Sequence, residues 1–433
     1  MADIFTIHGG KKLRGTIPVR GAKNAAFAIF AAALLTDEPC EIDNVPLVED
    51  ILVMLEIFKS VGVRCEFISE RKVRIHAAAV SAKDIRNDIV ENIRASILLC
   101  GSLSMRTKKL KLAKPGGCSI GARVLGPHID ALAPLGVIIH KSGKFLSIEH
   151  KEAMGDKEIV LSEMSVTATT NTVLASVLRK GTTTIYCAAA EPYVQDVCHF
   201  LVRMGAHISG IGTNTLVIRG VSRLHGADHF IMPDPIEMGT FITLAACTKS
   251  RIKIADAVPE FMRADLLKFE QAGVIVKMKK AKKSGARHWY AMQDIEVIPA
   301  PLGAIQKIHN MPYPGVCPDM LPLFSVLMTQ AKGVSLIHDW MYEGRLKYID
   351  ELKRMGADAF ICDPHRALIT GPTPLEGKNI TSFDLRAGAV LIIAALTAKG
   401  KTTIANVYQI DRGYEKIEER LKKIGADITR VSV

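Results

Sequence analysis

The segment KPGGCSIGAR, from Lys114 to Arg123, places a cysteine where it could react. Cys118 is surrounded by glycines and a proline, and a cation stands at each end of the segment. Positive charge stabilises a thiolate, so these two cations should lower the pKa of Cys118 and make it reactive toward electrophiles. The segment has a single large apolar side chain, Ile120, which is too little to anchor a core. The alternative interpretation is a buried structural thiol.

The length of the chain indicates more than one domain. At 433 residues it exceeds the size at which one hydrophobic core keeps growing, so two domains of about 200 residues are expected. Apolar residues make up 48% of the sequence, which is enough for two cores. The longest apolar runs, 25–35 and 389–398, have about half the length of a membrane-spanning helix, and MADIFTIHGG does not resemble a signal peptide. We therefore expect a soluble, cytoplasmic protein without a membrane partner.

Cysteine usage and charge narrow the possible ligands. The nine cysteines form no CxxC pair, and several lie within apolar helical patterns. This usage is typical of reduced thiols in the cytosol and argues against disulfides or a zinc site, so we expect no metal and no cofactor. The formal charge of +12 favours anionic partners such as nucleic acid, acidic lipid or phosphorylated small molecules.

A pattern recurs six times: an amphipathic segment with a bulky last residue, then glycine, a small residue and a β-prone run. The glycines are Gly62, Gly136, Gly205, Gly273, Gly356 and Gly425, at separations of 74, 69, 68, 83 and 69 residues. Each fits the C′ position of a helix, where the left-handed backbone costs little without a β-carbon. Upstream of most of them lies a more apolar helix followed by a short strand, so each unit should contain two helices and four strands. Helices that are apolar nearly all round must be buried on every side, so three units should enclose a helical core and six should form two similar α/β domains.

The whole chain resembles one known family. The repeat, the start RGAKNAAFAI (20–29), the loop PGGCSIGAR and the end IDRGYEKIEERL (410–421) are closely similar to the enolpyruvyl transferases, above all to those that commit a sugar nucleotide to bacterial peptidoglycan. This resemblance implies two inside-out α/β barrel domains, each of three βαβαββ repeats, with the active site in the cleft between them. The family's chain crosses over twice, which implies a first domain of residues 22–233 and a second of residues 1–21 and 234–433.

The resemblance also implies a reaction. The enolpyruvyl group of phosphoenolpyruvate would pass to the 3-hydroxyl of UDP-N-acetylglucosamine, with release of phosphate. Cys118 matches the family's general acid, which protonates the methylene carbon and which epoxides such as fosfomycin alkylate, and its glycines would let the loop close over the cleft. Asp319 matches the base that takes the proton from the attacking hydroxyl, and among cations it should stay ionised. The alternative for Asp319 is an N-cap of the following helix.

The remaining matches are substrate ligands. Those for phosphoenolpyruvate are Lys23, Asn24, Arg123, Arg345, Arg386 and Arg412. Guanidinium groups offer planar, two-pronged donors to phosphate and carboxylate, although exposed arginines more often form only a solvated surface. Those for the sugar nucleotide are Arg94, Val124, Leu125, Gly126, Pro127, Ser165, Val166 and Met341, together with Asp319. His128 could serve the loop or the nucleotide, or cap a helix.

The nucleotide side departs from the common family pattern. The run from Val124 to His128 lacks the usual carboxylate, Glu163 and Glu49 stand where lysines are usual, and Pro235 replaces an arginine. The phosphoenolpyruvate side is intact. Alternative acceptors are therefore another nucleotide or a phosphorylated alcohol such as shikimate 3-phosphate, although the shikimate enzyme lacks the cysteine loop.

A nucleic-acid enzyme is the more distant alternative, because RNA 3′-phosphate cyclases share the repeat unit. A cyclase needs a histidine nucleophile, and no histidine follows His365. Aromatic residues for base stacking are also few, at 6% of the chain. We expect no nucleic-acid partner, and a monomer or weak homo-oligomer.

Overall fold

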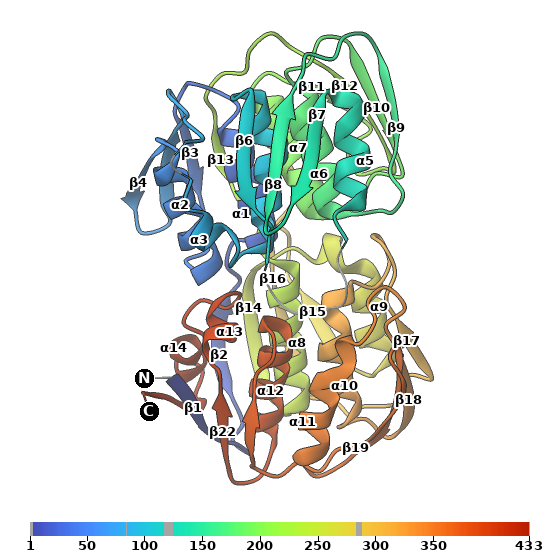
Figure 1. The fold of residues 1–433 in the computed structure, drawn as a ribbon. Helices are drawn as coiled ribbons and strands as arrows, with labels where there is room; N and C mark the ends of the chain where they lie inside the picture. The colour runs from blue at the N-terminus through green and yellow to red at the C-terminus, as the bar shows by residue number, and fades with distance from the viewer. Residues whose placement is uncertain (1–2, 84, 117–123, 283–287, 433) are drawn as a thin grey trace.

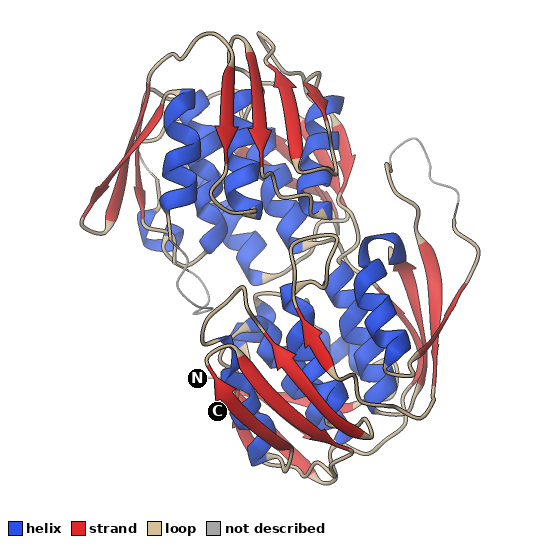
Figure 2. Cartoon of the chain, turned by 90° about the vertical axis from the view of Figure 1, so that its right-hand side faces the viewer, coloured by secondary structure: helices blue, strands red, loops and turns tan. Residues whose placement is uncertain are grey.

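The computed structural model describes residues 3–83, 85–116, 124–282 and 288–432. Within these ranges the chain forms two lobes of similar construction, which lie one above the other in Figure 1. In each lobe the helices gather inside and the strands cover the outer faces, as Figure 2 shows. Within the same ranges, no helix combines the length and apolar character needed to cross a membrane.

The first lobe contains seven α-helices and eleven strands within the described residues. The helices are α1 (Lys23–Ala33), α2 (Glu49–Ser60), α3 (Asn87–Val90), α4 (Leu99–Ser102), α5 (Gly126–Leu132), α6 (Val166–Ser176) and α7 (Pro192–Arg203), with 3₁₀ turns η1 (Arg94–Leu98), η2 (Leu103–Met105) and η3 (Ala133–Leu135). The strands are β3 (Cys40–Asp43), β4 (Arg64–Ser69), β5 (Lys72–His76), β6 (Lys109–Ala113), β7 (Val137–Ser142), β8 (Phe145–His150), β9 (Lys157–Val160), β10 (Thr182–Tyr186), β11 (His207–Ser209), β12 (Thr215–Arg219) and β13 (Asp228–Phe230).

The second lobe contains the other elements, including the first two strands of the chain. The helices are α8 (Pro235–Cys247), α9 (Arg263–Gln271), α10 (Leu321–Met328), α11 (Tyr348–Arg354), α12 (Leu385–Thr397), α13 (Tyr408–Asp411) and α14 (Ile417–Lys422), with η4 (Pro259–Met262), η5 (Pro318–Met320) and η6 (Arg345–Lys347). The strands are β1 (Asp3–His8), β2 (Arg14–Pro18), β14 (Arg251–Ala257), β15 (Ile275–Met278), β16 (Gln293–Ile298), β17 (Lys307–His309), β18 (Gly333–His338), β19 (Asp358–Asp363), β20 (Arg366–Gly371), β21 (Asn379–Thr381), β22 (Lys401–Ala405) and β23 (Asp427–Ser432).

The described strands form six separate sheets, matching the six repeats. Their orders are β13-β3-β5-β4, β6-β8-β7 and β11-β12-β10-β9 in the first lobe, and β15-β16-β14-β2, β17-β18-β20-β19 and β21-β22-β1-β23 in the second. The predicted α/β class and two-lobed arrangement are confirmed. None of the described sheets closes into a barrel, so the lobes are helical cores surrounded by open sheets.

The predicted helical cores are present. In the second lobe, α8, α10 and α12 pack on one another, and every residue of α8 and α10 is buried. In the first lobe, α1, α4 and α6 pack together in the same way. The six repeat glycines all have positive φ, between 85° and 102°, as their predicted C′ positions require.

Two segments cross between the lobes side by side. The backbone N–H of Ala22 donates to the carbonyl of Met232 at 2.7 Å, and that of Asp234 donates to the carbonyl of Arg20 at 2.8 Å. Between them, Gly21 lies so close to Asn44 that a β-carbon would be 1.9 Å from its carbonyl oxygen. Glycine is therefore required at this crossing.

Candidate active site

Asp319 lies in η5, directly before α10, where two arginines from other elements reach its carboxylate. Arg345 Nη2 donates to Oδ1 at 2.5 Å, and Arg386 Nε donates to Oδ2 at 3.2 Å. The arginine side chains are 3% and 4% exposed, whereas that of Asp319 is 26% exposed. Of the three groups, the carboxylate is the most accessible to a ligand.

Two opposing effects set the pKa of Asp319. Burial raises it, but the charges of Arg345 and Arg386 outweigh burial and hold the pKa below its usual range. The carboxylate is therefore ionised at neutral pH. The N-cap of α10 is Met320, and no side chain hydrogen-bonds there, so the capping alternative for Asp319 is wrong.

Arg386 occupies the first turn of α12. The N-cap Asp384 accepts hydrogen bonds from the backbone N–H groups of Arg386 and Ala387, at 2.8 and 2.9 Å, which fixes the start of the helix. The guanidinium lies 3.8 Å from Asp234 Oδ2 and over the ring of Tyr414. Its Nη1 is buried, and none of the described residues accepts a hydrogen bond from it. A buried N–H group without an acceptor lowers the stability of the fold. The site is therefore suited to an anion, which would accept this hydrogen bond.

Asp50, in the first turn of α2, joins two more of the predicted cations. Lys23 Nζ, from α1, donates to Oδ2 at 3.0 Å, and Arg412 Nε, directly after α13, donates to Oδ1 at 2.8 Å. The three side chains are only 7% to 9% exposed. Arg412 also donates to Gln409 Oε1 and to the carbonyl of Asn92, at 3.2 and 3.3 Å. A lysine of the first lobe and an arginine of the second thus share one carboxylate.

Asp50→Asn is expected to destabilise the protein, because it leaves two buried cations without their counter-charge. Breaking a buried ion pair by removing one partner costs about 3–5 kcal/mol. Inorganic phosphate should restore part of this loss by taking the place of the carboxylate, and should raise the melting temperature of the variant more than that of the wild type. Thermal unfolding with and without phosphate measures both effects.

Asp88→Asn is the matched control, since Asp88 pairs with Arg86 on the surface, where both side chains are more than half exposed. That variant should lose at most about 1 kcal/mol, with no special response to phosphate. An Asp50→Asn protein as stable as the wild type would contradict the shared-carboxylate interpretation.

Two further predicted ligands adjoin these groups. Asn24 follows Lys23 and is the one residue of α1 that is not buried. Met341 lies in the turn between β18 and η6. The next residue, Tyr342, places its ring 5.4 Å from the Arg345 guanidinium.

The residues predicted for the sugar nucleotide gather at two helix starts. Val124 is 65% exposed, Leu125 is the N-cap residue of α5, and Gly126 and Pro127 form its first turn. Ser165 caps α6 by accepting a hydrogen bond from the backbone N–H of Ala168, and Val166 is the first residue of that helix. Arg94 begins η1.

His128 connects these segments. Asn171 Nδ2 donates to His128 Nδ1 at 2.9 Å, so the neutral ring carries its proton on Nε2, which lies 3.2 Å from Thr167 Oγ1. The side-chain oxygen of Asn171, Oδ1, accepts a hydrogen bond from the backbone N–H of Gly101. Burial, and to a lesser degree the charge of Arg94, lowers the pKa of His128 to about 4. His128 is therefore a neutral structural link between α5 and α6 rather than a cap.

Cys118 and Arg123 lie outside the described residues, so their predicted roles rest on the sequence. The adjoining positions on either side, Gly116 and Val124, are exposed. Gly116 is packed so closely on Glu91 that a β-carbon would be 1.9 Å from its carbonyl oxygen.

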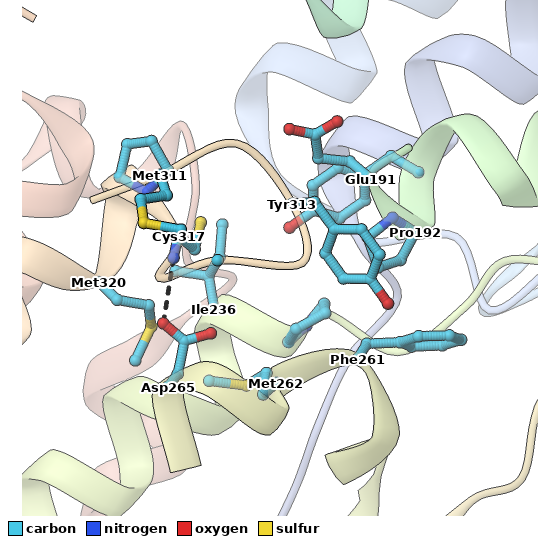
Figure 3. A pocket seen from close by; sticks show the side chains of 14 residues that line it. Glu191, Pro192, Ile236, Phe261, Met262, Asp265, Met311, Tyr313, Cys317 and Met320 are labelled. Atoms are coloured by element: carbon cyan, nitrogen blue, oxygen red, sulfur yellow. Dashed lines mark hydrogen bonds between the residues drawn. The ribbon is translucent and has the colours of Figure 1, made fainter. Parts of the chain in front are cut away.

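A small cavity of about 50 Å³ lies at the N-terminal end of α7 and beside Cys317 and Met320 (Figure 3). Its lining includes the N-cap residue of α7, Glu191, and the first residue of that helix, Pro192. Phe261 and Met262 of η4 and residues on either side of Asp319 also line it. Burial raises the pKa of Glu191 to about 6 and that of Asp265, which accepts from the backbone N–H of Cys317, to about 7. Most of the lining side chains are apolar, and the raised pKa values mean that the two carboxyl groups lose their protons less readily than usual. The cavity therefore suits an uncharged group better than an anion.

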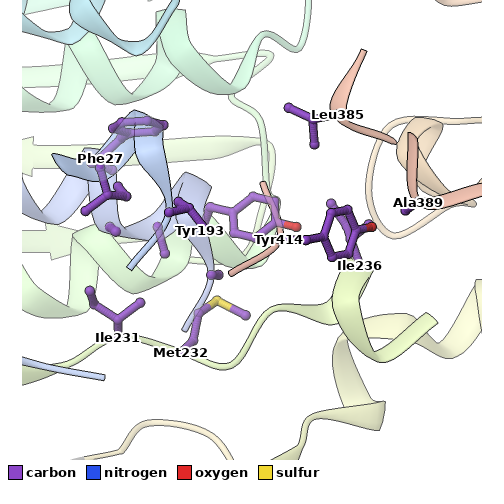
Figure 4. Close-up of a cluster of buried hydrophobic side chains, with 14 of the residues drawn as sticks. Phe27, Tyr193, Ile231, Met232, Ile236, Leu385, Ala389 and Tyr414 are labelled. Carbon is purple, nitrogen blue, oxygen red and sulfur yellow. The ribbon is translucent and has the colours of Figure 1, made fainter. Parts of the chain in front are cut away.

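Apolar side chains also pack where the lobes join (Figure 4). Tyr193 and Met232 come from the first lobe and the chain crossing, and Ile236 and Tyr414 come from the second lobe. The Tyr414 hydroxyl is hydrogen-bonded to Thr240 Oγ1 at 2.8 Å. This packing fixes Tyr414 beneath the guanidinium of Arg386.

Two residues of the site were not predicted from the sequence. Asp50, in VEDIL, looks like an ordinary acid in the first turn of a helix. Asn171, in TTNTV, looks like one polar residue within an apolar helix. Both act through partners far away in the sequence, and no local pattern identifies such partners.

Comparisons with known proteins show which family the chain is similar to. A model of the EPSP synthase (3-phosphoshikimate 1-carboxyvinyltransferase) family matches residues 7–421. The UDP-N-acetylglucosamine 1-carboxyvinyltransferase of Treponema denticola is 43% identical over 424 residues, covering 98% of both chains. The protein of the same name from Bradyrhizobium diazoefficiens is 40% identical over 432 residues, covering 100% of this chain and 99% of the relative.

Solved structures show the same fold. The enolpyruvyl transferase NikO from Streptomyces tendae matches with a TM-score of 0.88 and 25% identity, covering 100% of this chain and 99% of that one. An EPSP synthase from Acinetobacter baumannii matches with a TM-score of 0.76 and 19% identity, covering 99% and 100%, and so supports the fold alone. From the family model and the near full-length relatives, the chain belongs to the UDP-N-acetylglucosamine 1-carboxyvinyltransferase family, within the wider EPSP synthase family.

Proposed function

We propose that the chain transfers the enolpyruvyl group of phosphoenolpyruvate to the 3-hydroxyl of UDP-N-acetylglucosamine and releases phosphate, the first committed step of peptidoglycan synthesis. One observation carries the chemistry. Asp319 is ionised and accessible, and it is held by two buried arginines, one of which has a buried N–H without an acceptor among the described residues. This arrangement combines a proton acceptor with an anion site.

In the addition step, the 3-hydroxyl oxygen bonds to C2 of phosphoenolpyruvate while Asp319 takes the hydroxyl proton. Cys118 donates a proton to the methylene carbon, which becomes a methyl group, and a tetrahedral intermediate forms. In the second step that methyl group returns a proton to the Cys118 thiolate and the C2–O bond to phosphate breaks. The enol ether and inorganic phosphate leave, and the phosphate carries away the proton that Asp319 had taken. General acid and base assistance of this kind contributes about 10²- to 10⁴-fold in rate.

The arginines also explain how Asp319 could become a stronger base. A carboxylate held by two guanidinium groups binds a proton weakly. When the phosphate and carboxylate of phosphoenolpyruvate bind Arg345 and Arg386, these cations divide their charge between substrate and Asp319. The pKa of Asp319 would then rise when the acceptor hydroxyl is in place.

The other predicted ligands surround the same anion. Lys23 and Arg412 would bind phosphoenolpyruvate from opposite lobes, with Asn24 beside them and Arg123 closing from the cysteine loop. The sugar nucleotide would lie along Arg94, along the α5 start from Val124 to Pro127, and along Ser165 and Val166, with Asp319 and Met341 near its hydroxyl. The helix N-termini there offer backbone N–H groups to the diphosphate.

The domain boundaries belong to the same proposal. A first domain of residues 22–233 and a second of residues 1–21 and 234–433 agree with the pairing of β1 with β22 and β23, and of β2 with β14. The proposal includes no cofactor, metal or nucleic acid, and a monomer or weak homo-oligomer in the cytoplasm.

Phosphate release tests the proposal. Purified protein with phosphoenolpyruvate should release phosphate when UDP-N-acetylglucosamine is added and should not do so without an acceptor. Shikimate 3-phosphate and other nucleotides serve as competing acceptors. Release with one of these and none with UDP-N-acetylglucosamine would leave the chemistry in place and refute the acceptor.

A further inference from the structure

A groove of about 860 Å³ lies between α9 and the edge strand β15 of the second lobe, and none of the residues assigned to the reaction lines it. One wall is a stripe of α9 whose members are spaced by three and four residues and therefore lie on one side of the helix. The stripe comprises Arg263, Leu266, Leu267 and Glu270. The other wall comes from the segment 274–278, which consists of β15 and the residue before it.

Large apolar side chains in this groove are open to solvent. Leu267 on α9, and Ile275 and Met278 on β15, are each about half exposed and all line the same groove. Large apolar side chains that gather at one place on a surface commonly mark a site where another molecule binds. The groove is therefore a candidate interaction surface.

The outer edge of β15 is unpaired within the described part of the chain, because β15 stands at the end of the sheet β15-β16-β14-β2. On its inner edge, the backbone N–H of Lys279 donates to the carbonyl of Asp294, which continues the pairing with β16. Backbone groups along a strand alternate between its two edges, so the N–H and C=O groups of Val276 and Met278 point to the open edge. These donors and acceptors can pair with another extended chain.

Positive charge gathers at the end of the same strand. Lys277, Lys279 and Lys280 are exposed, and none of them forms an ion pair with a described residue. Glu296, which lies opposite Lys277 in the ladder, is paired with Arg251 instead. An apolar groove with a positive end favours an occupant that is apolar in its middle and acidic at one end.

Three other occupants fit these features less well. A second copy of this chain, pairing through the same edge, would bring lysines against lysines, and edge lysines oppose such pairing. An anionic membrane surface cannot enter a concave groove, and Glu260 and Glu270 in the lining would repel it. Single-stranded nucleic acid is bound through aromatic stacking, and no aromatic side chain among the described residues lines this groove.

We propose that the groove between α9 and β15 binds an extended, acidic peptide segment of a partner protein, which adds to the open edge of β15 as a further strand. Antiparallel addition places the first residues of the peptide opposite Lys279 and Lys280, so these residues should be acidic. Alternate apolar side chains of the peptide then pack between Leu267 and Met278. This surface is separate from the substrate site, so the inference does not depend on the proposed function.

A phage-displayed library of random peptides tests this surface. The purified full chain should enrich peptides that begin with acidic residues and continue with alternating apolar ones. Counter-selection on a double variant, Lys279→Glu with Lys280→Glu, removes peptides that bind elsewhere, including those that bind the cations of the substrate site. If no peptide prefers the wild type to this double variant, the proposal is overturned.

Fluorescence anisotropy of an enriched, fluorescein-labelled peptide measures the affinity. The double variant should bind it about tenfold more weakly or worse, because two attractions become repulsions. The matched control is Lys141→Glu with Lys144→Glu, since these lysines are likewise exposed, in the edge strand β7 and in the turn after it. The control should bind the peptide as the wild type does. Equal losses in both double variants would indicate unspecific charge attraction and contradict the proposal.

Hydrogen exchange tests the addition of a strand. The enriched peptide should slow exchange of the backbone N–H groups of Val276 and Met278. Met278→Pro removes one of these groups and leaves the pairing with β16 intact, so it should weaken binding more than Met278→Ala does. Peptide binding that leaves both exchange rates unchanged would refute strand addition. Binding of phosphatidylserine vesicles through Lys279 and Lys280, with no enriched peptide, would assign the surface to membranes and overturn the proposal.

Discussion

Asp319→Ala is expected to lower kcat by about 10²- to 10⁴-fold, the usual worth of a general base. Binding of phosphoenolpyruvate should weaken little, because Arg345 and Arg386 remain and no longer share their charge with a carboxylate. The expected result is therefore a folded protein that binds the donor and scarcely turns it over. Phosphate-release assays give kcat, and calorimetric titration with phosphoenolpyruvate gives the affinity of the variant for this donor.

Asp363→Ala is the matched control for this experiment. Asp363 is paired with Arg366 in the β19–β20 hairpin, and its side chain is 29% exposed, close to the 26% of Asp319. Its loss should leave kcat unchanged. If Asp319→Ala proves unstable, Asp319→Asn keeps the size of the side chain and removes the base. Near-normal turnover in either folded Asp319 variant would rule out Asp319 as the base.

Cys118→Ser is expected to abolish most turnover, because a hydroxyl is a far weaker acid than a thiol flanked by cations. Cys118→Asp should retain activity, since a carboxylic acid can donate the proton, and should resist fosfomycin because it has no thiol to alkylate. Intact-mass measurement after fosfomycin treatment in the presence of UDP-N-acetylglucosamine should show one adduct on the wild type and none on either variant.

Cys187→Ser and Cys362→Ser control for general thiol reactivity, because both cysteines are exposed in the structure. Each should form the adduct as the wild type does. An unmodified Cys118 in the wild type, or full turnover by Cys118→Ser, would contradict its assignment as the acid.

The repeat explains why so much of the fold could be predicted. A glycine with positive φ after an amphipathic helix is a local requirement, and it is met at Gly62 and at the five later positions. Helices such as α8, apolar on every face, are likewise recognisable without tertiary information. The apolar helix of the second repeat was harder to predict, because residues 94–105 form α4 between two 3₁₀ turns rather than one regular helix. Its polar and small residues, among them Gly101, which packs against Asn171, hide the apolar pattern.

The site could be predicted only in part. The cations were recognisable from motifs, but their arrangement was not, because it depends on residues such as Asp50 that meet Arg412 only after the lobes assemble. Trp289, whose Nε1 donates a hydrogen bond to Asp196 Oδ1 of α7, shows the same limit. In a sequence it is one aromatic residue after a lysine-rich stretch, and its bond to Asp196 joins positions 93 residues apart.

The identity of the product tests the central claim most directly. The protein should be incubated with phosphoenolpyruvate and UDP-N-acetylglucosamine, and the nucleotide sugar should then be recovered and examined by NMR. The account predicts an enolpyruvyl ether on the 3-oxygen of the sugar, formed in equal amount to the released phosphate. Recovery of unmodified UDP-N-acetylglucosamine, while another phosphorylated alcohol in the same mixture gains the enolpyruvyl group, would contradict it.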